Sequence, residues 1–192
     1  QGESSRTQGK GTTDNKGSFA FQFPADLSKD LLSQRFIIEA TLADDNNQQV
    51  SSRTEVLVHK SERYVGLRPE QYVAKTGDSA AVELIVVDTE RQPVANSPVS
   101  VSFYHRKWLS VKELQPDGSY LWTSKPEDTL IESHRITTDS SGKAKASTVV
   151  DKSGLVRVVA EVADSANNKM RSATYIYVSG SGYASWRMES ND

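Results

Sequence analysis

The side chains best suited to chemistry in this sequence are three histidines, His59, His105 and His134, in a chain of 192 residues that has no cysteine. The lack of cysteine excludes disulfides, thiolate metal ligands and a cysteine nucleophile. The histidines lie far apart, and none has the spacing to a second histidine or to paired carboxylates that metal sites use. We therefore predict no metal-ligating and no cofactor-binding residues.

The serine and acidic residues form no catalytic pattern either. Ser153 lies where a hairpin is predicted, and residues 179–182 (SGSG) have the composition of a linker. No Ser-His-Asp order occurs in a strand–turn–helix context, which nucleophile elbows require. Charged residues make up 25% of the chain, so pairs of carboxylates are expected on its solvated strand faces. The sequence predicts no catalytic residues and a protein that is not an enzyme.

An acidic cluster, residues 44–47 (DDNN), raises the question of a calcium loop. Calcium usually takes six to eight oxygen ligands from a closed loop. The corresponding residues 164–168 (DSANN) have fewer carboxylates. A hairpin turn explains both segments, since Asp and Asn tolerate left-handed backbone. Asp14 and Asp139 are likewise expected to close Asx turns.

Aromatic residues offer two further candidate sites. Residues 104–108 (YHRKW) could form a contact strip for sugar or nucleic acid. We favour a strand leaving the sheet edge, with its cations over its aromatic rings. Trp108, Trp122 and Trp186 are candidate stacking residues for a carbohydrate-binding sandwich. Trp186 falls in the predicted linker and the other two flank a hairpin, so no common platform is expected.

Composition limits the partners of the chain. The net charge is −2 and the isoelectric point is near 6.0, which argues against nucleic acid as a partner. No apolar run approaches the roughly 20 residues that span a bilayer, so direct membrane insertion is not expected. The hydrophobic content of 36% allows one or two domains with modest cores.

The chain repeats itself at the spacing of a domain. Residues 12–17 (TTDNKG) return as residues 137–142 (TTDSSG), an offset of 137 − 12 = 125. Residues 43–58 resemble residues 163–178 at a constant offset of 120. Ala43-Asp44 matches Ala163-Asp164 at the start, and Val58 matches Val178 at the end. A repeat this long indicates tandem domains of one kind. The stretch 61–136 has no full counterpart in the first copy, which we therefore interpret as incomplete.

The local pattern is strand after strand. Period-2 alternation and β-branched runs recur between turn-forming clusters, which is typical of an all-β, antiparallel β-sandwich of the fibronectin III or Ig-like type. The nearest approach to a helix is a short excursion at residues 25–34. Ten residues in the apolar phase of their strands are predicted to form the core: Val82, Leu84, Val86, Val101, Phe103, Val158, Ala160, Val162, Ile176 and Val178.

We divide the chain into residues 1–60, the C-terminal half of a sandwich domain, residues 61–180, a complete domain, and residues 181–192, a linker. The first segment should supply strands near residues 18–23, 36–42 and 54–58 whose apolar face has no cover. We expect another chain to complete it, either a neighbouring copy in a homo-oligomer by strand exchange or a separate piece of the same parent.

Several blocks together resemble the macroglobulin-like domains of the bacterial α2-macroglobulin family. In that family a strand, a polar turn and a P-V-x-x-x-P-V connection open such a domain. The blocks that carry the resemblance are residues 54–59 (TEVLVH), 81–88 (AVELIVVD), 92–99 (QPVANSPV), 137–142 (TTDSSG) and 173–180 (ATYIYVSG).

The resemblance implies a part of a large protease-trapping inhibitor, in which a protease cuts a bait segment and the molecule rearranges around it. The family thioester needs Cys-x-x-Gln, so it is not in this chain, and no bait segment is evident. The chain would then lie upstream of both, as the end of the third macroglobulin-like domain and all of the fourth.

The implied function is a non-catalytic structural module of the protease trap. Its partners would be neighbouring macroglobulin-like domains and, through the intact parent, proteases. The implied location is secreted, periplasmic or at the cell surface, with a lipid anchor on the parent as an open question. The alternative is an Ig-like stalk module of a bacterial surface adhesin.

Overall fold

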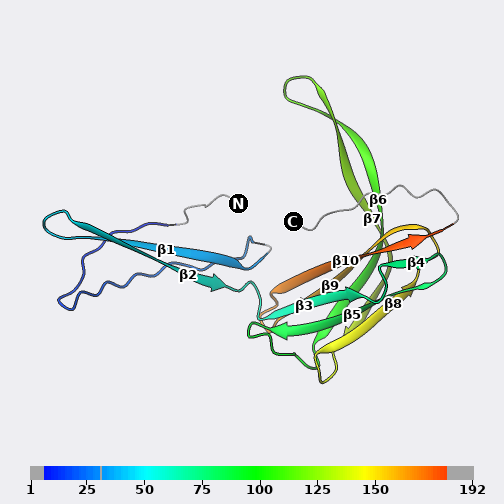
Figure 1. Cartoon of the computed structure of the whole chain (residues 1–192), viewed down its shortest axis with the longest axis horizontal. Helices are drawn as coiled ribbons and strands as arrows, with labels where there is room; N and C mark the ends of the chain where they lie inside the picture. The colour runs from blue at the N-terminus through cyan, green and yellow to red at the C-terminus, as the bar shows by residue number, and fades with distance from the viewer. Residues whose placement is uncertain (1–6, 31, 181–192) are drawn as a thin grey trace. The chain divides into compact units, whose positions relative to one another are not determined.

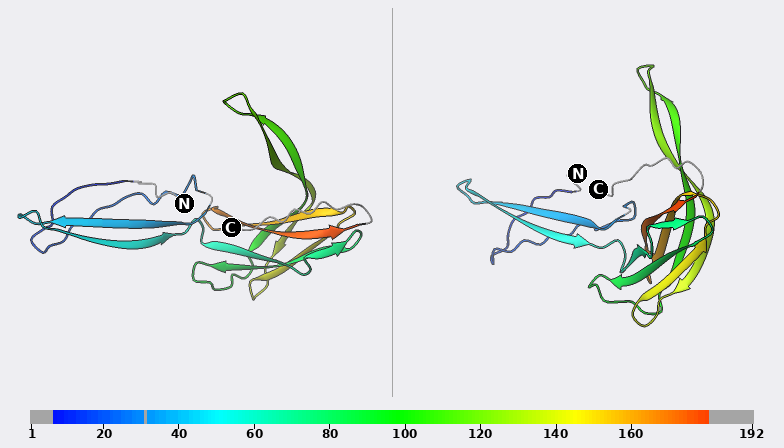
Figure 2. Two further views of the ribbon diagram at one scale, coloured as in Figure 1. Left: turned by 45° about the horizontal axis from the view of Figure 1, so that its top comes forward. Right: turned by 45° about the vertical axis from the view of Figure 1, so that its right-hand side comes forward.

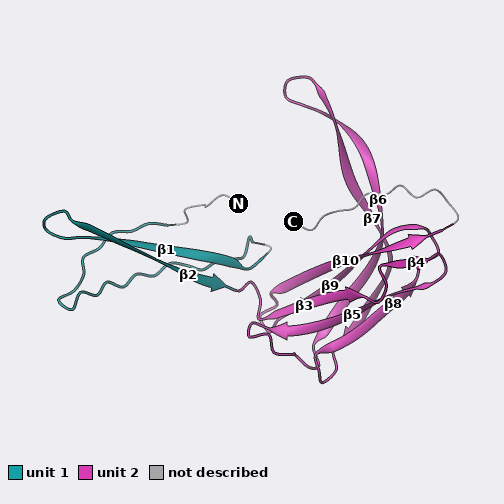
Figure 3. Cartoon of the chain, in the orientation of Figure 1, with its two compact units in different colours: residues 1–58 teal, residues 59–192 magenta. Residues whose placement is uncertain are grey.

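A computed structural model describes residues 7–30 and 32–180 of the chain, and within these residues the only regular secondary structure is β-strand. Two compact units divide the chain, unit 1 at Gln1–Val58 and unit 2 at His59–Asp192 (Figure 3). The predicted linker 181–192 lies outside the described residues. The strands labelled in Figure 1 are β1 Gln34–Ala43, β2 Gln49–Val58, β3 Arg63–Pro69, β4 Val73–Lys75, β5 Ser79–Asp88, β6 Pro98–Leu114, β7 Tyr120–Thr137, β8 Lys143–Val149, β9 Gly154–Ala163 and β10 Lys169–Ser179.

Unit 2 is a sandwich of two sheets, as the alternating apolar pattern predicts. One sheet has the strand order β4-β10-β9-β6-β7 and the other has the order β3-β5-β8. All neighbouring strands run antiparallel except β4 and β10, which are parallel. The two sheets lie face to face, and β6 and β7 extend together beyond them (Figures 1 and 2).

The core of unit 2 lies between these sheets. Every one of the ten predicted core residues is buried there, with Leu84 the most accessible at 3% exposure. Alternate residues of each strand point inward, so one face of each sheet supplies the core and the other meets solvent. Each large aliphatic or aromatic side chain buried in this way contributes about 1.5–3 kcal/mol.

The strands described in unit 1 form one hairpin, β1 with β2. The strand predicted at residues 18–23 is wrong as stated, because these residues pair with no other strand of the described chain. The helical excursion predicted at 25–34 is also reduced to a turn, in which the Asp26 carboxylate accepts the Ser28 N–H at 2.8 Å.

Unit 1 keeps a largely uncovered apolar face, as predicted. The rings of Phe19, Phe21, Phe23 and Phe36 stack in series, with centroids 6.5, 6.0 and 5.6 Å apart. Phe36 is buried at the end of this stack, whereas Phe19 and Phe21 are 51% and 53% exposed. Exposed aromatic rings in series are typical of a surface that another polypeptide covers.

The strand register confirms the internal duplication. Gln34 pairs with Val58 in unit 1 and Gly154 pairs with Val178 in unit 2, so both members of the pair shift by 120. The β1–β2 hairpin of unit 1 is therefore the counterpart of β9–β10, with the same side chains facing the same way. Val56, which has the place of the buried Ile176, is nevertheless 46% exposed, because no described residues of unit 1 form a second sheet over it.

One turn recurs at five places in the chain, including both members of each repeated block. It begins at Asp14, Asp44, Asp88, Asp139 and Asp164, whose Oδ1 atoms accept the backbone N–H groups two and four residues later at 2.8–3.0 Å. The residue three positions after each Asp has a positive φ. These are Asx-type turns, so the hairpin interpretation of residues 44–47 is confirmed.

Candidate functional site: a projecting hairpin arm

The feature that distinguishes unit 2 from a plain sandwich is a long hairpin arm. Strand β6 pairs with β9 only from Val99 to Arg106, and beyond that point it pairs with β7 alone. We define the arm as residues 107–127, which extend away from the sandwich in Figures 1 and 2. The sequence pattern predicts separate short strands at residues 111–114 and 120–123, joined by a hairpin turn at Asp117-Gly118. They join into one hairpin whose polar residues on both faces hide the alternation on which the prediction depended.

A buried arginine holds the base of the arm. The Arg106 side chain is only 9% exposed, and its Nε and Nη2 atoms lie 2.7 and 2.9 Å from the two carboxylate oxygens of Asp128 on β7. Its Nη1 donates to the Tyr175 hydroxyl at 3.0 Å, and the guanidinium lies 5.6 Å from the Tyr175 ring and 5.8 Å from Trp108. Bidentate geometry and ring stacking are the arrangements that arginine favours.

These contacts link three strands of one sheet. The Arg106 hydrogen bonds lower the pKa of Asp128 although burial opposes them, and Arg157 of β9 adds a contact at 3.2 Å. The interpretation of residues 104–108 as a strand with cations over aromatic rings is thereby confirmed. The arrangement fixes where the arm leaves the sheet.

The register of the arm divides its side chains between two faces, since directly paired residues lie on the same face. Trp108 pairs with Pro126, and Lys112 pairs with Trp122. Trp108 and Lys112 are four residues apart on β6, an even number, so their side chains lie on the same face. Trp108 and Trp122 therefore share a face, four residue pairs apart along the arm. Trp186, the third candidate, lies outside the described residues.

The outer half of the arm exposes large apolar side chains. The most exposed are Leu114 and Trp122, at 65% and 66%. Tyr120 is 59% exposed and has the Lys112 ammonium 4.0 Å from its ring centroid. Leu121, on the opposite face, is 53% exposed. Apolar side chains clustered on a two-stranded ribbon mark a surface for contact with another protein.

A five-residue turn closes the arm, as the Asp-Gly pair in the sequence predicts. Gln115 donates its N–H to Ser119 and accepts from Gly118, at 2.8 and 3.0 Å. Gly118 has φ of 82°, which glycine adopts without strain, and the Asp117 carboxylate accepts the Ser119 N–H at 2.9 Å. The tip is therefore a well-formed turn that presents the neighbouring apolar residues.

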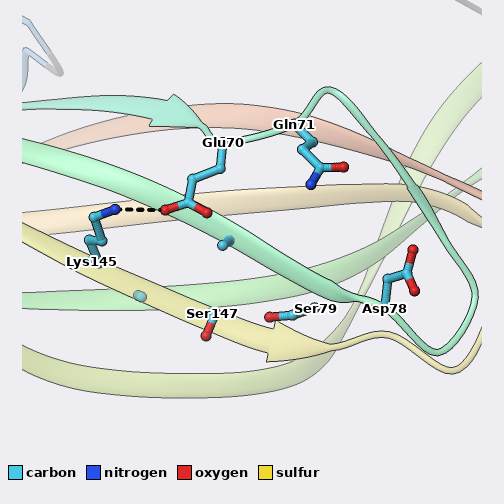
Figure 4. Close-up of a pocket in the computed structure, with 8 residues that line it drawn as sticks. Glu70, Gln71, Asp78, Ser79, Lys145 and Ser147 are labelled. Atoms are coloured by element: carbon cyan, nitrogen blue, oxygen red, sulfur yellow. Dashed lines mark hydrogen bonds and ion pairs between the residues drawn. The ribbon is translucent and has the colours of Figure 1, made fainter.

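A hollow of unit 2 lies elsewhere, between β5, β8 and the segment after β3 (Figure 4). Lys145 lines this hollow, and its Nζ atom lies 2.9 Å from a carboxylate oxygen of Glu70 and 3.0 Å from one of Glu83. Hydrogen bonds from Arg68 and then Lys145 lower the pKa of Glu83 to about 2. These are exposed ion pairs, which have little tendency to hold a ligand and contribute little to stability.

The three histidines lie in separate surroundings. His59 contacts the Tyr64 hydroxyl at 2.5 Å, His105 contacts the Ser153 carbonyl oxygen at 3.0 Å, and the His134 ring meets the edge of Phe103. In the described ranges, no three His, Cys, Asp or Glu side chains gather as metal ligands would. A search of the same ranges for a helix able to cross a membrane finds none.

Comparison with known proteins gives the chain its family. Residues 66–187 match the sequence model of bacterial macroglobulin domain 6. A comparison with curated proteins finds no match. The match to macroglobulin domain 6 corrects our expectation from resemblance that the complete domain is the fourth of its kind.

Solved structures show the same fold. The native conformation of Escherichia coli α2-macroglobulin matches with TM-score 0.52 and 16% identity, over 76% of this chain and 10% of that one. Salmonella α2-macroglobulin reacted with methylamine matches with TM-score 0.50 and 14% identity, over 75% of this chain and 10% of that one. The E. coli protein activated by porcine elastase matches with TM-score 0.51 and 18% identity, over 78% and 13%. This chain spans about a tenth of the length of these proteins, and by its sequence match it belongs to the bacterial macroglobulin domain 6 family.

Proposed function

We propose that this chain is a non-catalytic structural module of a bacterial α2-macroglobulin-like protease inhibitor and works through domain–domain contact. The observation that carries the proposal is the arm. The arm projects from a sandwich with a buried core, and Arg106 holds its base. Its side chains Leu114, Tyr120 and Trp122 are more than half exposed. Such a surface suits attachment to a neighbouring domain.

The partners we propose are the neighbouring macroglobulin-like domains of the parent protein, and proteases through the intact parent. The family match and the structure of the E. coli relative activated by porcine elastase support the protease as partner class. We place the protein outside the cytoplasm, as secreted, periplasmic or at the cell surface.

Protease assays on two forms of the protein test this function. In the first, the isolated chain is incubated with ester and peptide substrates and with serine proteases. We expect neither hydrolysis nor inhibition, because the sequence has no nucleophile motif in a strand–turn–helix context and the chain spans only about a tenth of its inhibitor relatives. In the second, the full-length product of the gene is mixed with elastase. A trap should block cleavage of a protein substrate while a small peptide substrate is still cut.

Catalysis by the isolated chain would contradict the structural role. A full-length protein that carries a cell-wall anchor and leaves elastase fully active on protein substrates would favour the adhesin stalk instead. A variant in which a two-residue Asn-Gly turn replaces residues 107–127 tests the contribution of the arm. Such a turn can join the two strands directly, because Asn-Gly closes two-residue hairpins. We expect this variant to fold as a sandwich but to reduce inhibition by the full-length protein.

A further inference from the structure

The arm has two open edges, and they differ in their capacity to pair. Along the sandwich β6 lies between β9 and β7, but none of the described residues continues the line of β9 beside residues 107–114. The outer edge of β7 is interrupted by Pro126, which has no N–H to donate. Residues 107–114 (KWLSVKEL) contain no proline, so this edge of β6 can pair along its whole length. We call it the open edge of β6.

The chain leaves β10 beside this open edge. Strands β6 and β10 both run antiparallel to β9, so they point in the same direction. Tyr177 of β10 pairs with Leu155 of β9, which in turn pairs with Arg106 of β6. Because β10 ends at Ser179, two residues further on, it ends at the level at which the open edge has begun. Residues 181–192, which lie outside the described residues, follow from this point.

Close contacts at two glycines connect the end of β10 to β6. A methyl group on Gly180 would lie 2.7 Å from the Ser153 Cβ, and one on Gly154 would lie 2.8 Å from the His105 Nε2. The same His105 nitrogen lies 3.0 Å from the Ser153 carbonyl oxygen. The backbone after β10 is thus packed against the residue before β9, which is itself packed against β6.

A short step would bring the following residues onto the open edge. The line of β10 and the line of β9 are one strand spacing apart, about 4.8 Å. Residues 180–182 (GSG) can reach roughly 10 Å, which is more than this step requires. A strand that continues β10 in this way would run parallel to β6. The same sheet already contains one parallel pair, β4 with β10.

We propose that residues 182–188 add to the open edge of β6 as a third, parallel strand of the arm, with Trp186 beside Lys112. Strand addition to an open edge provides backbone hydrogen bonds, and the alternate side chains provide specificity. The family match runs to residue 187, past the end of β10, so the segment belongs to the matched domain. The inference depends on the sheet topology and not on the proposed function. The β7 side of the arm, with Trp122, stays free for another domain.

The side chains of the segment match those of β6 at one offset, 186 − 112 = 74. There a cation meets an indole, opposite charges meet, apolar residues meet, and the smallest residue meets the largest. Such neighbours on one face are the pairs that stabilise a sheet. The pairs are Gly182–Trp108, Tyr183–Leu109, Trp186–Lys112, Arg187–Glu113 and Met188–Leu114.

Other offsets fit less well. A shift by one residue would exchange the two faces of the segment. A shift by two residues would place Arg187 beside Val111 in one direction and past Leu114 in the other, so the pair with Glu113 would be lost in both.

The attachment of the segment favours it over a separate chain. A strand joined by a short linker has an effective concentration in the millimolar range at its edge. A second copy or another protein would first lose its translational and rotational freedom. The occupant to which we commit is therefore this chain's own residues 182–188.

Introduced cysteines test the contact, because the natural chain has none. Ser110→Cys with Ala184→Cys places the two thiols on neighbouring strands at the proposed offset. Ser124→Cys with Ala184→Cys is the matched control, since Ser124 is the partner of Ser110 on β7 and lies one strand further away. Two strand spacings, about 9.6 Å, exceed the roughly 7 Å that a disulfide can bridge between Cα atoms. We expect mild oxidation to close the 110–184 pair within one chain at least about tenfold faster than the 124–184 pair.

Hydrogen exchange tests the same contact without cysteines. The natural chain is compared with a chain that ends at Gly180. We expect the amides of residues 107–114 that face away from β7 to exchange at least about tenfold faster in the shorter chain. Unchanged exchange of residues 154–163 shows that the sandwich is still folded.

Charge changes in the segment test the offset. Arg187→Glu should speed the exchange of residues 107–114 by about two- to fivefold, because like charges on neighbouring strands repel. Glu189→Lys is the control, since residue 189 would lie past Leu114 and its substitution should change little.

Five results would overturn the proposal. The two cysteine pairs close at equal rates, or neither pair closes. The 110–184 pair links separate molecules on a non-reducing gel, which would make a second copy the occupant. Residues 107–114 exchange at the same rate with and without residues 181–192, which would mean that the edge is open or that something else covers it. Arg187→Glu and Glu189→Lys have equal effects, which would contradict the offset.

Discussion

The Asp164 carboxylate accepts the backbone N–H of Glu62 at 3.1 Å, across 102 residues of chain. Asp164 closes the β9–β10 turn, and Glu62 precedes β3, so this bond joins the end of the sandwich to its first strand. The side chain of Asn168 also donates to the same carboxylate, at 3.0 Å. Asp44, its counterpart in unit 1, makes only the local turn bonds among those described.

Asp164→Ala should therefore destabilise unit 2 by about 2–3 kcal/mol, because it removes a buried carboxylate that accepts hydrogen bonds from Glu62, Ala166 and Asn168, and bonds to a charged acceptor are among the stronger ones. Asp44→Ala is the control, and it should have less effect because the Asp44 side chain is exposed. Urea unfolding of both variants, followed by the fluorescence of unit 2, measures the difference. Equal losses in the two variants would contradict the special role of Asp164.

The same carboxylate predicts a pH dependence. Burial raises the pKa of Asp164, but hydrogen bonds from Asn168 and Glu62 outweigh it and lower the pKa from 3.8 to about 2. A folded-state pKa below the unfolded value means that the contribution to stability is complete above about pH 4 and is lost as the pH falls toward 2. Stability of the natural chain should fall more steeply between pH 4 and 2 than that of Asp164→Asn. Parallel curves for the two proteins would refute this linkage.

Arg106→Lys should loosen the base of the arm. Lysine cannot make the two parallel hydrogen bonds to Asp128 or stack its head between Trp108 and Tyr175. We expect a loss of about 1.5–3 kcal/mol in stability and faster hydrogen exchange in residues 107–127. Arg68→Lys, at an ion pair whose arginine is 76% exposed, is the control and should change stability much less, because water screens exposed ion pairs. Unchanged exchange in the arm of Arg106→Lys would show that its base is held by other contacts.

Arg91 occupies the left-handed position of the Asp88 turn, with φ of 66°. Asn47 and Asn167 hold the same position in the turns that begin at Asp44 and Asp164. Arg91→Asn should stabilise unit 2 by about 0.5 kcal/mol, because asparagine tolerates this conformation better than other side chains do. Glu90→Asn, one residue earlier, should give no gain in the same thermal unfolding experiment. A lower melting temperature for Arg91→Asn would mean that Arg91 makes a stabilising contact of its own.

Much of the fold could be predicted from spacing alone. The offset of 120 between the two hairpins is reproduced in their register, and the Asp-led turns lie where their residues predict them. The core residues of β5 and β9 follow strict alternation, because each strand has one face inside the sandwich and one outside. Local turn chemistry and alternation are properties of single strands, so a single sequence reveals them.

What could not be predicted depends on pairing between strands. The shared face of Trp108 and Trp122 follows from the β6–β7 register, which includes an irregularity between Phe103 and Tyr104. Residues 18–23 alternate as a strand should, yet they pair with no strand in the described part of the chain. The Arg106 cluster joins β6, β7 and β10, and no spacing in the sequence indicates that these three strands meet.

The most direct test of the account is whether the arm is covered by a neighbouring domain in the full-length protein. Oxidative footprinting with mass spectrometry reports this at Trp122, which is 66% exposed in the structure described here. We predict rapid oxidation of Trp122 in the isolated chain and at least about tenfold slower oxidation in the full-length protein, as burial at a protein interface requires. Equal oxidation rates in the two forms would contradict the role of the arm in domain–domain contact.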